Sequence, residues 1–322
     1  MTYDYMIVGA GFYGSIMANE LTKRNKRVLV IDKRNHIGGN CYTEVRDGII
    51  CHQYGPHVFH TNDRNIWYYL QALSDWRPFH HTVKVKYREQ YYSFPPNLLT
   101  TQQLDNMKVE VLFRGYSEKQ WGMPYGSIPS SIINRIPVRD NFNDSYFDDE
   151  YVALPKYGYT PLIERLLDKS EVLTNTEYAH TDEDYKKLVW SGPIDEYFGE
   201  SGLLGYRSLR FDDTLYHTPD KQGCAVINYA DRDIPYTRTI EHKWFHPTDV
   251  DHTIVTKEFP MDKGEPYYPI PTLRNLTNYK ALKKAAKVHK DVIFGGRLGT
   301  YKYMDMDEVI AQALADSRKE LS

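Results

Sequence analysis

GAGFYG, residues 9–14, is the stretch that decides the fold. It has the pattern G-x-G-x-x-G, in which Gly9 permits a tight turn, Gly11 lets the backbone approach a pyrophosphate, and Gly14 allows close helix packing. The helix that follows, with Phe12 as its first residue, would direct its free N–H groups toward the phosphates. The stretch therefore predicts a dinucleotide site, with a purely structural glycine turn as the alternative.

The residues on both sides of this stretch strengthen the prediction. Tyr3–Val8 is expected to form a buried strand, Phe12–Asn25 a helix with apolar residues at helical spacing, and Val28–Ile31 a second buried strand. Asp32 ends the second strand about 20 residues after the glycines, where a carboxylate can accept hydrogen bonds from a ribose. Together these segments predict a β-α-β unit of a parallel sheet.

The rest of the chain indicates a mixed α/β protein. Residues 87–120 are expected to form a strand followed by one or two short helices, and β-rich segments recur after residue 155 between Pro, Gly and Asp turns. Val292–Phe294 is expected to be a strand, residues 295–297 a tight loop, and Asp305–Leu321 a helix. The C-terminus thus repeats the order of strand, glycine loop and helix.

Charge and hydropathy argue against several classes of function. The formal net charge of −3 gives no bulk attraction for nucleic acid or acidic lipid, so a few placed cations must hold any anionic ligand. The chain has no apolar run long enough to span a membrane and no secretory leader pattern. We therefore expect a soluble cytoplasmic protein that binds neither nucleic acid nor membrane.

The potential metal ligands do not form a recognisable metal site. Cys41, Cys51 and Cys224 are widely spaced, which favours buried thiols over a disulfide framework or a zinc site. His57 and His60 have the spacing of a metal-binding pair, but no third ligand is evident nearby. We expect no metal. The 28 tyrosines suit a wet pocket for a polar ligand, although each could also lie at the edge of the core.

The glycine pattern alone does not choose between nicotinamide and flavin dinucleotides, and the next segments help to choose. Arg34 and the pair Gly38-Gly39 directly follow Asp32, as they often do in flavoproteins. From here the chain resembles UDP-galactopyranose mutases. The similar blocks follow in the family's order: DKRNHIGGN (32–40), QYGPHVFHTND (53–63), GYSEKQWG (115–122), RIPVR (135–139), SGPID (191–195), GYRSL (205–209), IPYTR with EHK (234–243), EPYYP (265–269) and FGGRLGTYKYMDMD (294–307).

This resemblance implies a fold class and a domain division. The fold would be α/β, with a Rossmann-like FAD-binding domain, a small helical insertion and an antiparallel β-sheet domain. The FAD-binding domain would comprise residues 1–78, 186–222 and 286–322, the helical domain residues 79–131, and the β-sheet domain residues 132–185 and 223–285. Bacterial members usually have a longer helical domain, which contributes to dimer contacts and to the substrate lid. A homodimer is therefore possible, but oligomeric state and lid are the least transferable properties.

The resemblance also implies a cofactor site for FAD. Its residues would be Gly9, Gly11, Phe12, Gly14, Asp32, Lys33, Arg34, Gly38, Gly39, Asn40, His57, Arg297, Tyr303 and Met304. By this resemblance His57 lies against the isoalloxazine ring and contacts both flavin and ligand. The alternative for His57 is a packed loop histidine.

For the substrate, the resemblance implies a diphosphate held between Arg139 and Arg238, since guanidinium groups bind phosphate oxygens with bidentate geometry. Surface ion pairs are the alternative for both, and Arg135 is expected to be structural. The other substrate-binding residues would be Phe113, Tyr116, Ser117, Trp121, Tyr146 or Tyr151, Asn228, Tyr267, Tyr268, Tyr303 and Asp305. Phe113 would stack on uracil and Trp121 would lie near the sugar, with core packing as their alternative. Asp305 could instead be a helix cap.

The activity implied by the resemblance is the interconversion of UDP-galactopyranose and UDP-galactofuranose. Reduced FAD is required, and its N5 forms a covalent adduct with the anomeric carbon of the sugar while UDP leaves. Three other interpretations stay open at this point. They are a related UDP-N-acetylgalactopyranose mutase, a flavin amine-oxidase-like oxidoreductase, and a non-catalytic flavoprotein or assembly factor.

Overall fold

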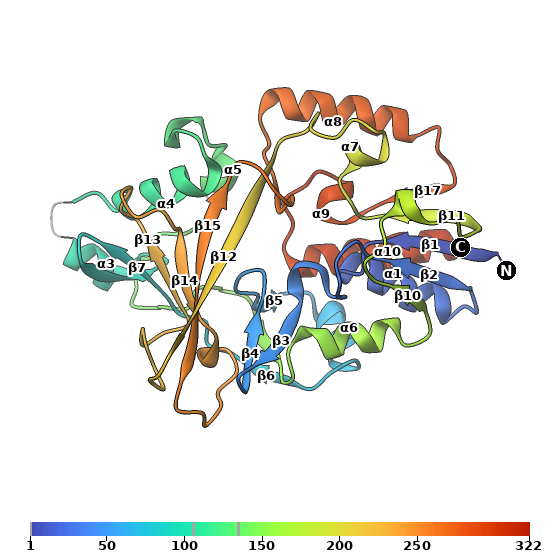
Figure 1. Cartoon of the computed structure of the whole chain (residues 1–322). Helices are drawn as coiled ribbons and strands as arrows, with labels where there is room; N and C mark the ends of the chain where they lie inside the picture. Colours follow the sequence, from blue (N-terminus) through green and yellow to red (C-terminus); the bar gives the residue numbers. More distant parts are fainter. Residues whose placement is uncertain (1, 105–106, 134–135) are drawn as a thin grey trace.

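A five-stranded parallel sheet lies at the end of the molecule that holds both termini (Figure 1). The computed structural model describes residues 2–104, 107–133 and 136–322. The strands of this sheet, in spatial order, are β10 (Glu171–Leu173), β2 (Val28–Ile31), β1 (Tyr3–Val8), β11 (Tyr185–Trp190) and β17 (Val292–Phe294). All four neighbouring pairs are parallel.

The predicted β-α-β unit is confirmed at the centre of this sheet. All four residues of β2 are buried, as expected for a parallel strand that is covered on both faces. The helix α1 (Phe12–Thr22) packs against α10 (Met306–Leu321) and α6 (Tyr159–Leu167). The helix α1 ends earlier than predicted because Asn25 adopts a positive φ of 57°, which a helix cannot contain.

A seven-stranded sheet forms the other half of the molecule (Figure 1). Its strands, in spatial order, are β16 (Tyr268–Pro269), β12 (Tyr206–Tyr216), β15 (Thr253–Met261), β14 (Arg238–Glu241), β13 (Val226–Tyr229), β7 (Val83–Tyr87) and β8 (Gln90–Phe94). The pairing is antiparallel except between β13 and β7, which are parallel. The expected antiparallel sheet is therefore present, with one parallel pair inside it.

The strands do not follow the predicted segment boundaries, so the domain division stays a prediction. The strands β7 and β8 fall in the segment 79–131 that was expected to be helical, yet they extend the seven-stranded sheet. Conversely, β10 falls in a segment expected to belong to the β-sheet domain, yet it pairs with β2. These pairings join residues far apart in the chain, so local patterning does not reveal them.

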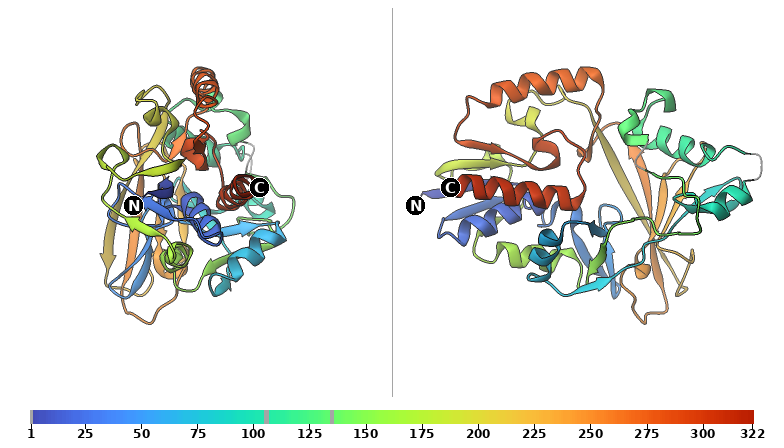
Figure 2. Two further views of the ribbon diagram at one scale, coloured as in Figure 1. Left: turned by 90° about the vertical axis from the view of Figure 1, so that its right-hand side faces the viewer. Right: turned by 180° about the vertical axis from the view of Figure 1, so that it is seen from behind.

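The remaining elements connect and cover the two sheets. A three-stranded sheet has the order β5 (Phe59–Thr61), β9 (Tyr151–Pro155) and β6 (Trp76–Pro78), and β3 (Thr43–Arg46) pairs with β4 (Ile49–His52). The other helices are α2 (Arg64–Gln71), α3 (Leu98–Gln103), α4 (Val111–Trp121), α5 (Ser130–Ile133), α7 (Ile194–Tyr197), α8 (Leu273–Ala286) and α9 (Gly296–Gly299). The helix α8 lies along one outer edge of the molecule in every view (Figure 2). No helix in the described ranges is both long and apolar enough to cross a membrane.

The helix α4 approaches the end of β13 very closely at Gly115. A Cβ atom on Gly115 would lie 1.8 Å from the carbonyl oxygen of Ala230, which is a backbone atom that cannot rotate away. The absence of a side chain at this position therefore sets the distance between α4 and the seven-stranded sheet.

We predict that Gly115→Ala destabilises the protein, although the same change in an open helix position would stabilise it. The added methyl group must push α4 away from the sheet, which costs about 1–3 kcal/mol. Chemical denaturation of the two proteins measures this difference. Gly126→Ala is the matched control, because a Cβ atom there would meet nothing within 4 Å. Equal denaturation midpoints for Gly115→Ala and the wild type would contradict the prediction.

Candidate functional site

A cavity of about 610 Å³ lies at the carboxyl ends of the parallel strands, where α/β sheets bind their ligands. Loops that follow four of the strands form most of its wall, namely the glycine loop after β1, residues 32–41 after β2, residues 191–193 after β11, and the segment 296–298 after β17. The predicted cofactor residues on its lining are Gly9, Gly11, Phe12, Asp32, Lys33, Arg34, Gly38, Gly39, Asn40, His57 and Arg297. This cavity is called the dinucleotide cavity below.

Close backbone contacts explain why glycines border the dinucleotide cavity. Gly9 adopts a φ of 101°, and a Cβ atom there would lie 2.2 Å from Ser191 Oγ. A Cβ atom on Gly14 would lie 2.0 Å from the carbonyl oxygen of Gly9, so helix α1 packs directly on the turn. Gly39 also has a positive φ, and its Cβ atom would lie 3.0 Å from the Cα atom of Gly11. The two glycine loops therefore meet where larger residues would not fit.

Asp32 links the two loops through its carboxylate. Its Oδ2 atom accepts a hydrogen bond from the Ala10 N–H at 2.8 Å, and its Oδ1 atom accepts one from the Arg34 N–H at 2.9 Å. A carboxylate has about four acceptor sites, so two remain for a ligand hydroxyl. The role of Asp32 toward a ribose stays a prediction, while its role in holding the loops is visible in the structure.

Arg34 presents a donor that has no protein partner. Its Nη2 atom donates to Asn40 Oδ1 at 3.0 Å, and its guanidinium lies 4.3 Å from the centre of the Tyr54 ring. Its Nη1 atom is buried and makes no hydrogen bond. A buried unsatisfied donor is costly, and a bound anionic group would satisfy it. The dinucleotide cavity thus combines a glycine wall with a cation suited to a phosphate or a polar cofactor atom.

His57 is held as a neutral imidazole beside the same cavity. Its Nδ1 atom lies 2.8 Å from the carbonyl oxygen of Gly55, so Nδ1 carries the proton and Nε2 is left as an acceptor. Burial, together with the charges of Arg297 and Arg238, lowers the pKa of His57 to about 4. The side chain is therefore uncharged at neutral pH.

A chain of buried histidines supports the His57 loop from behind. His52 Nδ1 accepts the His57 backbone N–H at 3.2 Å, and so the His52 Nε2 atom, 3.2 Å from His246 Nε2, carries the proton. His242 Nδ1 accepts the His52 backbone N–H at 3.2 Å, and His242 Nε2 lies 2.7 Å from Thr256 Oγ1. Burial lowers the pKa of His242 to about 3 and that of His246 to about 4. This arrangement requires neutral rings.

A second cavity of about 400 Å³ lies between α4, the seven-stranded sheet and residues 146–149. The predicted residues on its lining are Phe113, Tyr116, Ser117, Trp121, Tyr146, Asn228, Arg238, Tyr268, Tyr303 and Asp305. They come from segments far apart in the chain and still share one cavity. This cavity is called the aromatic cavity below.

Arg238 is the arginine on the lining of the aromatic cavity within the described part of the chain. Its Nε atom donates to Glu258 Oε2 at 2.7 Å, and Glu258 is fully buried. Burial opposes the charge on Arg238, but Glu258, with Tyr116 and Tyr268, raises the pKa of Arg238 well above its ordinary value. Burial also raises the pKa of Tyr116 and of Tyr268, so both phenols keep their protons and can donate.

The two cavities adjoin each other through Arg297, Tyr268 of β16, and Tyr303 in the segment between α9 and α10. The rings of Tyr268 and Tyr303 stack at 5.5 Å, and the Arg297 guanidinium lies 5.3 Å from the centre of each ring. Arg297 lines the dinucleotide cavity, whereas Tyr268 and Tyr303 line the aromatic cavity. A ligand in one cavity would therefore lie next to a ligand in the other.

Comparisons with known proteins identify the family. A family model described as UDP-galactopyranose mutase matches residues 111–303, and one described as an NAD(P)-binding Rossmann-like domain matches residues 7–73. A probable UDP-galactopyranose mutase from Klebsiella pneumoniae is 37% identical, and the match covers 99% of this chain and 95% of the relative. The chain belongs to the UDP-galactopyranose mutase family.

Other relatives and structures agree with this family membership. A dTDP-fucopyranose mutase from Escherichia coli is 35% identical over 96% of both chains, and a UDP-galactopyranose mutase from Mycoplasma genitalium is 32% identical over 100% of this chain and 95% of the relative. A crystal structure of reduced UDP-galactopyranose mutase has a TM-score of 0.79 at 13% identity, over 100% of this chain and 94% of that chain. The fold is thus that of the family.

This chain is a short member of the UDP-galactopyranose mutase family. Its match to the Klebsiella pneumoniae relative extends over 366 positions, which is 44 more than the 322 residues of the chain. That relative therefore has at least 44 residues with no counterpart here. The shorter helical domain stays a prediction.

Several predicted site residues lie outside both cavity linings. Gly14 packs against the glycine turn, Met304 accepts hydrogen bonds from Arg297 through its carbonyl oxygen, and Tyr151 stacks on Trp67 at 5.3 Å. Two predicted residues line a different cavity from the one expected: Tyr267, a predicted substrate residue, lines the dinucleotide cavity, and Tyr303, also predicted for the cofactor, lines the aromatic cavity. Arg135 lies outside the described residues.

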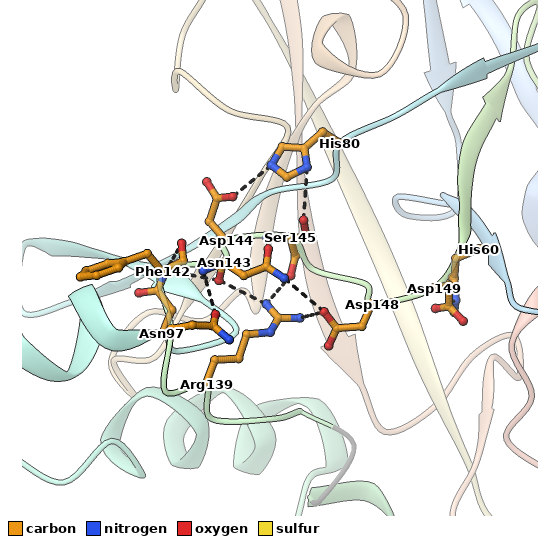
Figure 3. A network of polar contacts seen from close by, with 11 residues as sticks. His60, His80, Asn97, Arg139, Phe142, Asn143, Asp144, Ser145, Asp148 and Asp149 are labelled. Atoms are coloured by element: carbon orange, nitrogen blue, oxygen red, sulfur yellow. Dashed lines mark hydrogen bonds and ion pairs between the residues drawn. The ribbon is translucent and has the colours of Figure 1, made fainter.

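Arg139 also lies outside both linings, and Figure 3 shows why. Its Nη2 atom lies 2.7 Å from Asp148 Oδ1, and its Nη1 atom donates to the carbonyl oxygen of Ser145. The Arg139 side chain is 6% exposed, so its donors are directed into its own loop. The alternative of an ion pair describes Arg139 in this structure, although the arginine itself is buried and only the Asp148 side chain, at 61% exposed, lies on the surface.

Sequence reasoning missed several residues of the aromatic cavity. Phe94, Gln120, Phe147, Asp148 and Asp149 line it as well as the apolar residues Ile132, Ile133, Ile136 and Pro137. The segment SYFDD, residues 145–149, follows the RIPVR block after five intervening residues and contains both an aromatic pair and two carboxylates. This composition could have indicated a ligand-binding segment, but only Tyr146 was predicted from it as a site residue.

Lys119 is a further missed residue, which positions one wall of the aromatic cavity. Its Nζ atom lies 2.9–3.0 Å from four backbone carbonyl oxygens at the end of β13 and in the loop between β13 and β14, those of Tyr229, Asp231, Ile234 and Tyr236. Burial lowers the pKa of Lys119 to about 8. An ammonium group has three N–H donors, so the four oxygens share them and the loop is tied to α4.

The histidine chain predicts a loss of stability in acid. A histidine whose folded pKa is depressed binds protons in the unfolded state first, so its contribution is fully present above about pH 6.5 and is lost as the pH falls toward 4. We expect the free energy of unfolding, measured in urea, to fall steadily over this range. His246→Gln should reduce the slope, whereas His180→Gln, at a residue whose side chain is 73% exposed, should not. If the free energy of unfolding depends equally on pH in the wild type and in both variants, the assignment of the acid sensitivity to the histidine chain is contradicted.

Proposed function

We propose that this chain is an FAD-dependent UDP-galactopyranose mutase, which interconverts UDP-galactopyranose and UDP-galactofuranose. One observation carries the proposal: a cavity suited to a dinucleotide adjoins an aromatic cavity in which a buried carboxylate keeps Arg238 charged. Family membership supports the same reading. A structural neighbour such as putrescine oxidase, with a TM-score of 0.58 at 13% identity, shares the fold alone.

The residues of the dinucleotide cavity fit FAD. Gly9, Gly11 and Gly39 leave room for a pyrophosphate to approach the backbone, and the unsatisfied Arg34 Nη1 atom is available to a polar atom of the cofactor. Reduced flavin, when bound, supplies a nucleophilic nitrogen for the anomeric carbon of the sugar. His57 would lie against the flavin ring as a neutral acceptor.

The residues of the aromatic cavity would bind the sugar nucleotide. Arg238 would hold the diphosphate, and the hydroxyls of Tyr268 and Tyr303 would donate to phosphate oxygens without adding charge. Retaining the diphosphate beside the sugar removes much of the entropic cost of a second encounter when the nucleotide returns. Phe113 and Trp121 would contribute stacking surface and exclude water.

Arg139 would contribute a second cation only after its ion pair with Asp148 opens. A diphosphate that binds beside Asp148 would repel that carboxylate and favour the exchange of partners, since like charges raise each other's free energy. The role of Arg139 in binding the diphosphate is therefore a proposal that requires a rearrangement of residues 139–149.

A turnover assay tests the proposed activity. The purified chain should carry a yellow cofactor that dithionite bleaches, and the reduced protein should convert UDP-galactofuranose to UDP-galactopyranose without net consumption of reductant. Separation of the two sugar nucleotides by chromatography measures the conversion. A chain that oxidises an amine, or that leaves the sugar nucleotide unchanged in the reduced state, would contradict the proposal.

A second candidate substrate, dTDP-fucopyranose, differs from the first in both the sugar and the base. The Escherichia coli relative at 35% identity is named a dTDP-fucopyranose mutase, so the same assay should include dTDP-fucopyranose. Our proposal expects the larger kcat/KM for the uridine substrate. A larger kcat/KM for dTDP-fucopyranose would support the proposed mutase chemistry, but it would identify dTDP-fucopyranose rather than the uridine nucleotide as the preferred substrate.

For Arg238, we predict that Arg238→Lys lowers kcat/KM for the sugar nucleotide by about 10- to 100-fold. Lysine can keep an ion pair with the buried Glu258 carboxylate, but it loses the bidentate donors that suit a phosphate, worth about 1.5–3 kcal/mol. Steady-state kinetics and UDP binding measure the effect. Arg232→Lys is the matched control, since that side chain is 64% exposed and pairs with Glu118. Equal kcat/KM for Arg238→Lys and the control would contradict the role.

A further inference from the structure

The helix α8 and the residues beside it carry a cluster of basic side chains, whereas the rest of the chain has a net negative charge. Residues 266–290 contain Arg274, Lys280, Lys283, Lys284, Lys287 and Lys290 and no Asp or Glu. This segment therefore has a formal charge of +6, and since the whole chain has −3, the remaining residues carry −9. All six side chains are exposed, and within the described ranges none of them forms an ion pair. The positive charge is thus free to act on a partner.

One face of α8 is anchored to the protein. Leu282 is buried among Ile194, Leu204 and Tyr301, and Asn278 Nδ2 donates to the Leu203 carbonyl oxygen at 3.1 Å. These contacts fix the rotation of the helix about its axis.

The opposite face is presented to solvent along the outer edge of the molecule (Figures 1 and 2). Helical spacing places Leu273, Lys280, Lys284 and Lys287 on the side away from Leu282. Leu273 is 84% exposed, and Val288, two residues after the end of the helix, is 76% exposed. An exposed aliphatic residue therefore stands at each end of a row of lysines. Glu200 and Asp291, which lie on neighbouring segments, leave this region with a net positive charge.

We propose that α8 binds the surface of an anionic lipid bilayer, with its axis along the membrane. The lysines would pair with lipid phosphates, while Leu273 and Val288 would enter the boundary between headgroups and acyl chains. The acidic remainder of the molecule would be repelled by the same surface, which orients the protein with α8 toward the lipid. Nucleic acid fits less well, because exposed aliphatic side chains have no favourable contact with phosphates and α8 presents no exposed aromatic ring for stacking.

Sedimentation of the full chain with lipid vesicles tests this proposal. Vesicles of phosphatidylcholine with about 30% phosphatidylglycerol should bind the protein at low salt, and vesicles of phosphatidylcholine alone should not. About 1 M NaCl, where the Debye length is about 3 Å, should release it. The double substitution Lys280→Gln with Lys284→Gln should lower the partition coefficient about thirty-fold, since each lysine near an anionic surface contributes about a factor of five.

The matched control is Lys26→Gln with Lys169→Gln, which removes the same charge from exposed positions elsewhere. It should leave vesicle binding unchanged, and Leu273→Ala should weaken it. None of these residues lines either cavity, so mutase turnover serves as an independent check that each variant is folded. Equal loss in both double variants, or no binding to anionic vesicles, would overturn the proposal. Binding of a DNA or RNA duplex through Lys280 and Lys284 without vesicle binding would also overturn it.

Discussion

The buried ion pair between Arg238 and Glu258 is the constraint on which the proposed substrate site depends. The two residues face each other across the antiparallel strands β14 and β15, and Glu258 has no exposure to solvent. A buried carboxylate that loses its cation is strongly destabilising, so the fold favours the conformation in which Arg238 is turned toward Glu258. The pairing therefore fixes both the charge and the direction of the cation that lines the aromatic cavity.

Two backbone contacts build the rest of the site around this cation. Gly115 brings α4 against the end of β13, and Lys119 ties the same helix to the loop between β13 and β14. On the other side, the glycines of the loops after β1 and β2 leave the groove of the dinucleotide cavity open. Arg297 lies between the two cavities, against Tyr268 and Tyr303. The dinucleotide cavity and the aromatic cavity are thereby adjacent, as the proposed reaction between a flavin and a sugar requires.

The parts of the fold that were predicted correctly are those in which the signal is local. The strand Tyr3–Val8, the glycine turn and the strand Val28–Ile31 follow one another in the chain, and each carries its own pattern. The pairing of β7 with β13 joins residues 83–87 to residues 226–229, and no local pattern reports it. The same reason explains why the seven-stranded sheet crosses the predicted segment boundaries.

In the candidate site, too, some features could be predicted from the sequence and others could not. The candidate residues could be named because they occur in blocks similar to those of a known family, and many of them line one of the two cavities. Their roles toward a cofactor and a substrate stay predictions. The hydrogen-bond or ion-pair partner of each side chain could not be predicted. Arg139 pairs with Asp148 inside its own loop, and Asp32 holds two backbone N–H groups. Both outcomes depend on distances that exist only once the chain has folded.

The most direct test of the central claim is a crystal structure of the chain with its flavin and UDP. The account predicts the flavin in the dinucleotide cavity and the diphosphate in the aromatic cavity, with phosphate oxygens within hydrogen-bonding distance of Arg238. A diphosphate bound elsewhere, with Arg238 in contact only with Glu258, would contradict the account.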